Sequence, residues 1–144
     1  MLGRTTYTLD EINSARFAMA AQLTAYATLA NETSGDTALA ALDDFEPLFF
    51  NNLVLALDRY FVHRVRAVSG RNGNPLNEVE LLADSLMNNN AVLRGNSVVA
   101  YTPAASIVKL ELGDDIRLTA AEFADLADAF FAELEARFLP DSDA

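Results

Sequence analysis

The side chains best suited to chemistry lie in one stretch of this sequence, from Asp58 to Leu82, which reads DRYFVHRVRAVSGRNGNPLNEVELL. The stretch holds the only histidine, His63, and four of the ten cationic residues, with no acidic residue from Arg59 to Asn77. Arg59 and His63 are four residues apart, so they are neighbours on one face of a helix. This concentration of positive charge is suited to holding a phosphate or carboxylate group.

The turn SGRNGN supplies further groups for an anion. Arg66 lies seven residues after Arg59 on the same helical row, and Arg71 stands in the turn itself. The backbone amides that follow Asn74 open the next helix, and a helix N-terminus carries a partial positive charge. We predict an anion-binding position formed by Arg66, Arg71 and Asn74. In the alternative interpretation, Arg64 and Arg66 complement the dipole at a helix end, and Asn74 is only an N-cap.

The chain offers few ligands for a metal or a cofactor. It has no cysteine and one histidine, so a metal at His63 would need several carboxylate and amide ligands. The Glu-x-x-His pattern of di-iron bundles is absent because residue 60 is Tyr. A hydrolytic triad would require a serine near His63 in space, and the sequence alone cannot place one there. We therefore predict no metal and no cofactor.

The composition indicates a folded, acidic protein. The 144 residues are 51% hydrophobic and carry a net charge of −11, which disfavours binding to a nucleic-acid backbone. No segment approaches the roughly 18 uninterrupted apolar residues of a membrane span, and we expect a cytoplasmic protein without membrane attachment. The length fits a single helical domain over residues 1–144, with residues 1–6 and 140–144 frayed.

Helical patterns run through the first half of the chain. A capping box in TLDE begins a helix at Thr8 that ends near Ala30, and a second helical region opens at Asp36. Because proline kinks a helix interior, Pro47 predicts a break near Phe45. The apolar face of the segment that follows is predicted to consist of Phe50, Leu53, Val54, Leu57, Tyr60 and Phe61.

The pattern changes in the second half. Asn74 is predicted to cap a helix that ends in the NNN at 88–90. Residues 97–101 and 107–112 read as extended, and the second alternates as IVKLEL, so we predict a small two-stranded hairpin. A capping box beginning at Thr119 opens the last helix. The expected fold is mainly α: a single-domain bundle of four to five helices with a small β-hairpin before the last helix.

Two resemblances follow from these segments. FFNNLVLALDRYFVHRVRAVSGRNGNPLNEVELL, together with LELGDDIRLTAAEFADLADAFFAELEARFL, resembles a family of small helical proteins from actinobacteria that has no assigned activity. The similarity covers roughly the last two-thirds of the chain, and GNPLNEV is its most recognisable part. It implies a helical domain and carries no catalytic residue across.

More distantly, LVLALDRYFVHRV is similar to the central helix of HEPN-type domains, which are helical bundles. Many of these dimerise and some cleave RNA. Their motif separates Arg and His by four to six residues, whereas three residues separate Arg59 from His63 here. If the resemblance extends to activity, it implies that His63 is the acid/base and that Arg59 or Arg64 supports a phosphate.

The sequence therefore leaves two functional hypotheses of different classes. The first is a non-enzymatic helical interaction module that forms a homodimer and carries a local anion-binding turn. Its partners would be a second copy, a small anion or another protein, and not nucleic acid. The alternative is a HEPN-like ribonuclease, or its inactive relative, with Arg59, His63 and Arg64 at the catalytic site.

Overall fold

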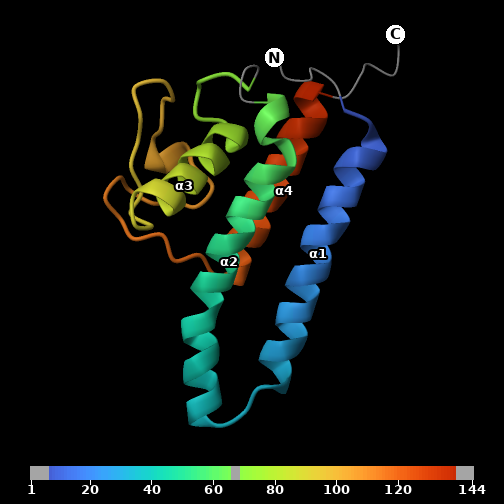
Figure 1. The fold of residues 1–144 in the computed structure, drawn as a ribbon, viewed down its shortest axis with the longest axis vertical. Coiled ribbons are helices and arrows are strands. Elements are labelled where there is room, and N and C mark those ends of the chain that lie inside the picture. The colour runs from blue at the N-terminus through green and yellow to red at the C-terminus, as the bar shows by residue number, and fades with distance from the viewer. Residues whose placement is uncertain (1–6, 66–68, 139–144) are drawn as a thin grey trace.

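Four α-helices make up the fold in the computed structural model, which describes residues 7–65 and 69–138. They are α1 (Leu9–Glu32), α2 (Asp36–Val65), α3 (Pro75–Asn88) and α4 (Ala120–Phe138), with one short 3-10 helix, η1 (Pro103–Ala105), between α3 and α4. Helices α1 and α2 form a long antiparallel pair, α4 packs against both, and α3 packs on α2 and α4 (Figure 1). The predicted mainly helical bundle is confirmed, whereas residues 1–6 and 140–144, predicted to be frayed, lie outside the described residues.

Capping boxes begin the first and last helices as predicted. The Thr8 hydroxyl oxygen accepts the Glu11 amide at 3.1 Å, and the Glu11 carboxylate accepts the Thr8 amide at 3.1 Å. The same pair of bonds, both 3.1 Å, joins Thr119 and Glu122. Each box satisfies amides at a helix start that have no partner within the helix.

The predicted break near Phe45 is wrong. Helix α2 continues through Pro47 as one helix of 30 residues. Proline removes one backbone hydrogen bond and crowds the preceding turn, which kinks a helix without necessarily ending it. Pro47 is buried, and Phe50 and Val54 beyond it are fully buried, so packing outweighs the local cost.

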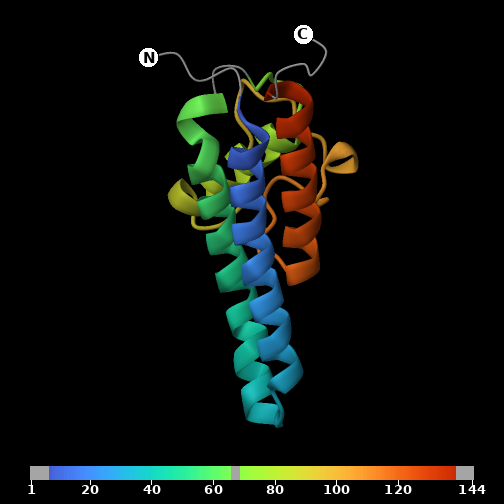
Figure 2. The same ribbon diagram turned by 90° about the vertical axis from the view of Figure 1, so that its right-hand side faces the viewer.

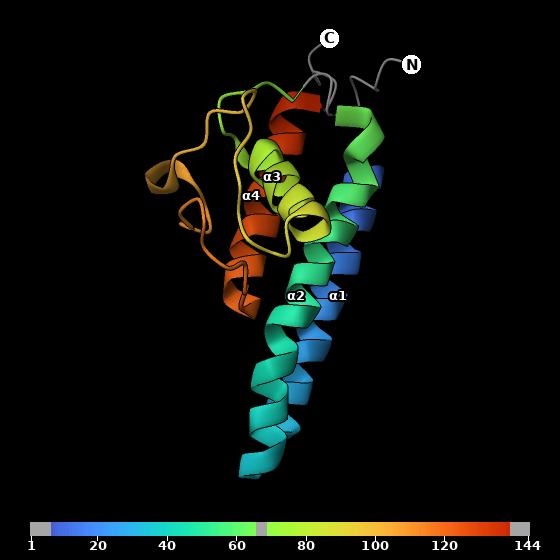
Figure 3. The same cartoon turned by 60° about the vertical axis from the view of Figure 1, so that its left-hand side comes forward.

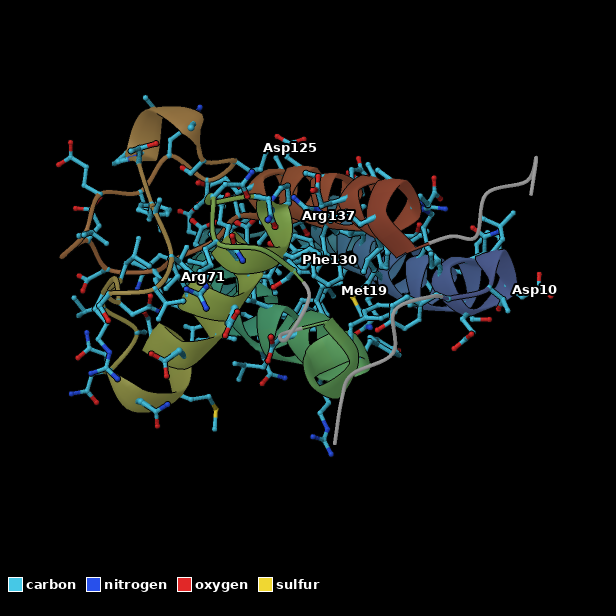
Figure 4. The ribbon with its side chains drawn as sticks, turned by 90° about the horizontal axis from the view of Figure 1, so that it is seen from above. Asp10, Met19, Arg71, Asp125, Phe130 and Arg137 are labelled. Carbon is cyan, nitrogen blue, oxygen red and sulfur yellow. The ribbon has the colours of Figure 1, made fainter. Side chains whose placement is uncertain are left out.

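One continuous apolar core joins the helices. The predicted inner face of α2 is buried at all its positions except Tyr60, which is 43% exposed. Viewed along the bundle, Met19 of α1 and Phe130 of α4 lie between the helices, and Asp10 and Asp125 lie outside (Figure 4). The largest fully buried side chains are Tyr7, Ile12, Met19, Phe50, Leu57, Leu81, Leu82, Leu93, Ile116, Leu118, Phe123 and Phe131.

The predicted β-hairpin is not seen. Within the described ranges the only bridge pairing is an isolated antiparallel bridge between Val92 and Asp115. The alternating segment 107–112 makes hydrogen bonds to side chains instead, and the Tyr101 hydroxyl donates to the Leu110 carbonyl at 2.5 Å. Lys109 has φ of 59°, which interrupts an extended strand, and Ile107 and Val108 pack next to the core on successive positions.

The α1–α2 pair extends well beyond the other two helices. Helix α4 begins beside the middle of α2, where the Ala120 amide donates to the Glu46 carboxylate at 2.8 Å. Past that level only α1 and α2 continue, joined by a short connection at their tip (Figures 1 and 2). We call residues 20–46 the projecting hairpin.

Candidate functional site

The turn before α3 is built by the amide side chain of Asn74. Its oxygen accepts the amides of Leu76 at 2.9 Å and Asn77 at 3.2 Å, which confirms the predicted N-cap. Its nitrogen donates to the Ser69 carbonyl at 2.7 Å and to the Asn72 side chain at 2.8 Å. The first two amides of α3 with no helical partner are therefore already bonded within the protein.

The side chain of Asn77 also holds this turn, through hydrogen bonds to Gly70 and Gly73. It is fully buried, its nitrogen donates to the Gly70 carbonyl at 2.9 Å, and its oxygen accepts the Gly73 amide at 3.0 Å. Gly73 has φ of 82°, and a Cβ atom there would overlap the Ala100 carbonyl oxygen. Only glycine adopts a positive φ without strain and has no Cβ atom to overlap a neighbouring carbonyl. The GNPLNEV segment is thus explained by its structural role.

Glu78 continues this role toward the long α3–α4 connection. Its side chain is 2% exposed, and its carboxylate accepts the amide of Ile107 at 2.8 and 3.2 Å and that of Val108 at 3.0 Å. A buried carboxylate is tolerated where such bonds replace its hydration. Glu78 was not predicted from the sequence. The available signal was its position four residues before Leu82, which places it on the apolar face of this helix.

The predicted anion-binding residues are only partly described. Arg71 is exposed and lines a pocket of about 300 Å³ together with Glu80, whose carboxylate opposes its charge there. Asn74 is buried and used as a cap. Arg66 lies outside the described residues, so the predicted Arg66–Arg71–Asn74 position stays a prediction. The remaining pocket residues are Ser69, Gly70, Asn96, Val98 and Val99.

One cation near this turn was not foreseen. The Arg137 guanidinium lies 3.5 Å from the point where a Cβ of Gly70 would stand, and it pairs with Glu133 one turn earlier in α4. Seen along the bundle, Arg71 lies on the α3 side of the molecule and Arg137 on α4 (Figure 4). The turn therefore carries one arginine of its own, Arg71, and lies beside a second one, Arg137, from a distant part of the sequence.

The residues of the ribonuclease alternative are not brought together by any described contact. Arg59 is exposed on α2. His63 and Arg64 fall within the last turn of α2, but their side chains lie outside the described residues. The catalytic interpretation of these three residues stays a prediction.

The projecting hairpin has an unusual surface. None of its residues from Ala20 to Glu46 is buried, although about half of them are apolar. Its exposed large side chains include Leu29 of α1 and Leu39 and Phe45 of α2, the last two each 42% exposed. Elsewhere in α2 the apolar residues are mostly covered, so this part of the helix pair lacks the packing that stabilises the rest.

A row of aromatic rings leads from the core onto this surface. Phe50 lies 5.7 Å from Phe123 of α4 and 4.9 Å from Tyr26 of α1, measured between ring centroids. Phe49 stacks on Tyr26 at 6.2 Å and on Phe45 at 5.4 Å. The row ends at the half-exposed Phe45. Aromatic side chains in such positions are typical anchors of protein interfaces.

Acidic side chains surround the row. Burial raises the pKa of the Tyr26 phenol, and the neighbouring carboxylate of Glu46, its hydrogen-bond partner, and that of Asp43 raise it further. From Phe17 to Leu57 the chain has five acidic residues and no Lys, Arg or His. The five are Glu32, Asp36, Asp43, Asp44 and Glu46.

These negative charges are not balanced within the protein. Among residues 7–65 and 69–138 no ion pair reaches Glu32, Asp36, Asp43 or Asp44. The last turn of α1 contains Glu32 and no basic residue, and a negative charge at a helix C-terminus opposes the helix dipole. The projecting hairpin therefore combines apolar anchors with uncompensated negative charge.

No protein-family model, curated protein or solved structure matches this chain. No cluster of three or more His, Cys, Asp or Glu side chains suited to a metal ion occurs in the part of the chain that the structure describes. Over the same residues, no helix has both the length and the apolar character needed to cross a membrane.

Proposed function

We propose that this protein is a non-enzymatic helical interaction module that binds a partner through its projecting hairpin. One observation carries the proposal: about 27 consecutive residues, half of them apolar, contribute no buried side chain. Short helices in water gain most of their stability from tertiary packing of an apolar face. Large exposed apolar surfaces that persist in a folded protein mark binding sites. A partner would supply the missing cover.

The size of the surface fits a specific interface. Stable protein–protein interfaces involve roughly 20–30 residues on each side. The projecting hairpin has about that number on its two antiparallel helices, with Leu29, Leu39 and Phe45 exposed along them. Aromatic anchors within an apolar area and charged groups around them are the usual arrangement of such interfaces.

The polar residues near the turn support a non-enzymatic function. Asn74, Asn77 and Glu78 are all bonded to backbone groups of neighbouring loops. Side chains used in this way hold the fold, and their burial keeps them away from a substrate. The anion-binding turn predicted from the sequence would then be an accessory feature centred on Arg71.

Self-association, expected from the sequence, is one form of this proposal. Homodimers commonly hide an apolar face against the same face of a second copy. Two projecting hairpins in contact would, however, bring five carboxylates of each copy together without a cation from either hairpin. Like charges in an interface disfavour association. The charge distribution therefore favours a different protein over a second copy.

Site-specific photo-crosslinking in cells of the native host tests the proposal. A photoreactive amino acid replaces Phe45 or Leu39 in the projecting hairpin, and Met87 or Leu112 in matched controls that are also exposed. We expect discrete crosslinked products from the first pair and none from the second. A product of twice the chain mass would indicate the homodimer. Equal crosslinking at all four positions, or none in the hairpin, would contradict the proposal.

A further inference from the structure

We infer that the partner of the projecting hairpin is a basic amphipathic helix of another protein. The inference rests on the proposed function and adds the chemical class of the partner. Three features of the described residues lead to it: the direction of the uncovered face of α2, the exposed leucine on that face, and the charge around it.

The uncovered face is the one that α4 covers further along. It carries Asp36, Leu39, Asp43 and Glu46 and continues into the buried Phe50, with spacings that alternate between three and four residues. Phe50 contacts Phe123 of α4, and Glu46 accepts the first amide of α4. Beyond the point where α4 begins, α1 is the one described helix that runs beside α2 (Figure 3). Leu39 and Asp43 belong to this part of the face, since they precede Glu46 in α2.

A helix fits this position better than an extended segment. The space continues the line of α4 along α2, and α4 shows that a helix packs on this face. From Asp36 to Glu46 the face is about 15 Å long at 1.5 Å per residue, which is roughly three helical turns. Helix-in-groove recognition uses apolar anchors at such spacings on both partners. On this face Leu39, which is 42% exposed, supplies the anchor of this chain; Phe45 lies about 120° further round α2 and stands outside the face.

The charge around the anchors selects a cationic helix. Asp36 and Asp43 stand on either side of Leu39 along the face, and Asp44 is adjacent in sequence. No cation lies in the chain between Phe17 and Leu57 to oppose them. Lysine or arginine on the flanks of an apolar helix would pair with these carboxylates. Complementary charge of this kind directs the choice of partner and speeds association.

A defined peptide tests the inference with the purified full chain. The probe is a synthetic helix of about 18 residues with leucine on one face and lysine on both flanks, which is long enough to cover three turns. A second peptide has the same composition in scrambled order and presents no apolar face. At physiological salt we expect the amphipathic peptide to bind at least about tenfold more tightly than the scrambled one, because only it can use the anchors.

Variants locate the binding site. We expect Leu39→Ser, alone or combined with Phe45→Ser, to weaken binding of the amphipathic peptide at least about tenfold, since the anchor on the uncovered face is lost. Asp43→Asn combined with Asp44→Asn should weaken it less and reduce its dependence on salt. The matched controls are Met87→Ser, and Asp125→Asn combined with Asp128→Asn on the exposed side of α4; both should bind as the wild type does. Melting curves verify that each variant is folded.

Two results would overturn the inference. Equal binding of both peptides, or equal losses in the control variants, would mean general attraction to an acidic protein. A concentration-dependent dimer that the Leu39→Ser, Phe45→Ser variant abolishes would identify a second copy as the occupant. In both cases the proposed function would still hold if crosslinks form at Phe45 and not at Met87. Failure of the inferred partner class is therefore distinguishable from failure of the proposed function.

Discussion

Individual side chains at the start of α3 stabilise neighbouring loops by hydrogen bonds to their backbone groups. Asn74 and Asn77 bind the preceding turn, and Glu78 binds the extended segment that contains Ile107 and Val108. Each of these side chains replaces a hydrogen bond that a sheet would otherwise provide. The polarity of this region is therefore explained by the fold, and stability measurements are the appropriate test.

Removal of the Glu78 carboxylate should destabilise the protein. We expect Glu78→Ala to lower the free energy of unfolding by about 2–4 kcal/mol, because two backbone amides lose their partner at a buried site. Glu78→Gln should cost less, since its remaining oxygen can still accept one bond. Glu111→Ala, at an exposed site, should change stability by under about 0.5 kcal/mol. Urea unfolding measures all three, and a Glu78→Ala value as small as the control would refute the role.

Alanine substitutions at two glycines distinguish the cost of steric overlap from the cost of backbone strain. Gly73 and Gly35 both have positive φ, 82° and 91°, but only the first faces a backbone carbonyl, that of Ala100. Alanine at either position should cost about 1 kcal/mol for the left-handed conformation. We expect Gly73→Ala to cost at least about 1 kcal/mol more than Gly35→Ala in denaturant unfolding, because overlap adds to the strain. Equal losses would show that the turn can move away from Ala100.

The predicted anion position has a modest expected effect. Sulfate should raise the melting temperature of the wild type more than that of an Arg66→Ala, Arg71→Ala double variant. The difference should correspond to under about 1 kcal/mol, because exposed charge interactions are weak and Glu80 shares the pocket of Arg71. Thermal melting in sulfate and in chloride at equal ionic strength measures it. Identical shifts in both proteins would leave Arg71 as an ordinary surface arginine.

At the scale of elements, the sequence predicted helices well and irregular segments poorly. Capping boxes at Thr8 and Thr119 and the Asn74 cap are local signals, so they located helix starts correctly. The predicted β-hairpin was wrong because the amides of Ile107 and Val108 bond to Glu78, and a contact across about 30 residues leaves no local pattern. The projecting hairpin was also missed, since helical periodicity does not show where α4 begins relative to α2.

Replacement of Pro47, which lies inside α2, should change the stability of that helix. Its position inside α2 costs the helix one hydrogen bond, and a proline in a helix interior is worse than alanine by about 3 kcal/mol. Pro47→Ala restores the bond but leaves a small buried space, so we expect a net gain of about 1–2 kcal/mol in unfolding free energy. A loss of stability in chemical denaturation would mean that the proline ring is needed for packing at the level of Glu46.

At the scale of the whole molecule, the two ends of the fold differ. One end has four helices around a continuous core, and the other is a pair of helices with acidic and apolar side chains exposed (Figure 2). The net charge of −11 is expected to keep copies apart, and under the proposed function the aromatic row from Phe50 to Phe45 lies at the binding site of a different protein. We propose that the fold divides into a stable body and a projecting hairpin that binds the partner.

Hydrogen exchange measured along the chain, with and without the lysine-flanked amphipathic peptide, tests that claim most directly. In the protein alone, amides of residues 20–46 should exchange faster than those of residues 75–88, because no buried side chain stabilises the projecting hairpin. With saturating peptide, exchange should slow at least about tenfold in residues 20–46 and stay unchanged in residues 75–88. Protection confined to residues 75–88, or spread equally over the whole chain, would contradict the account.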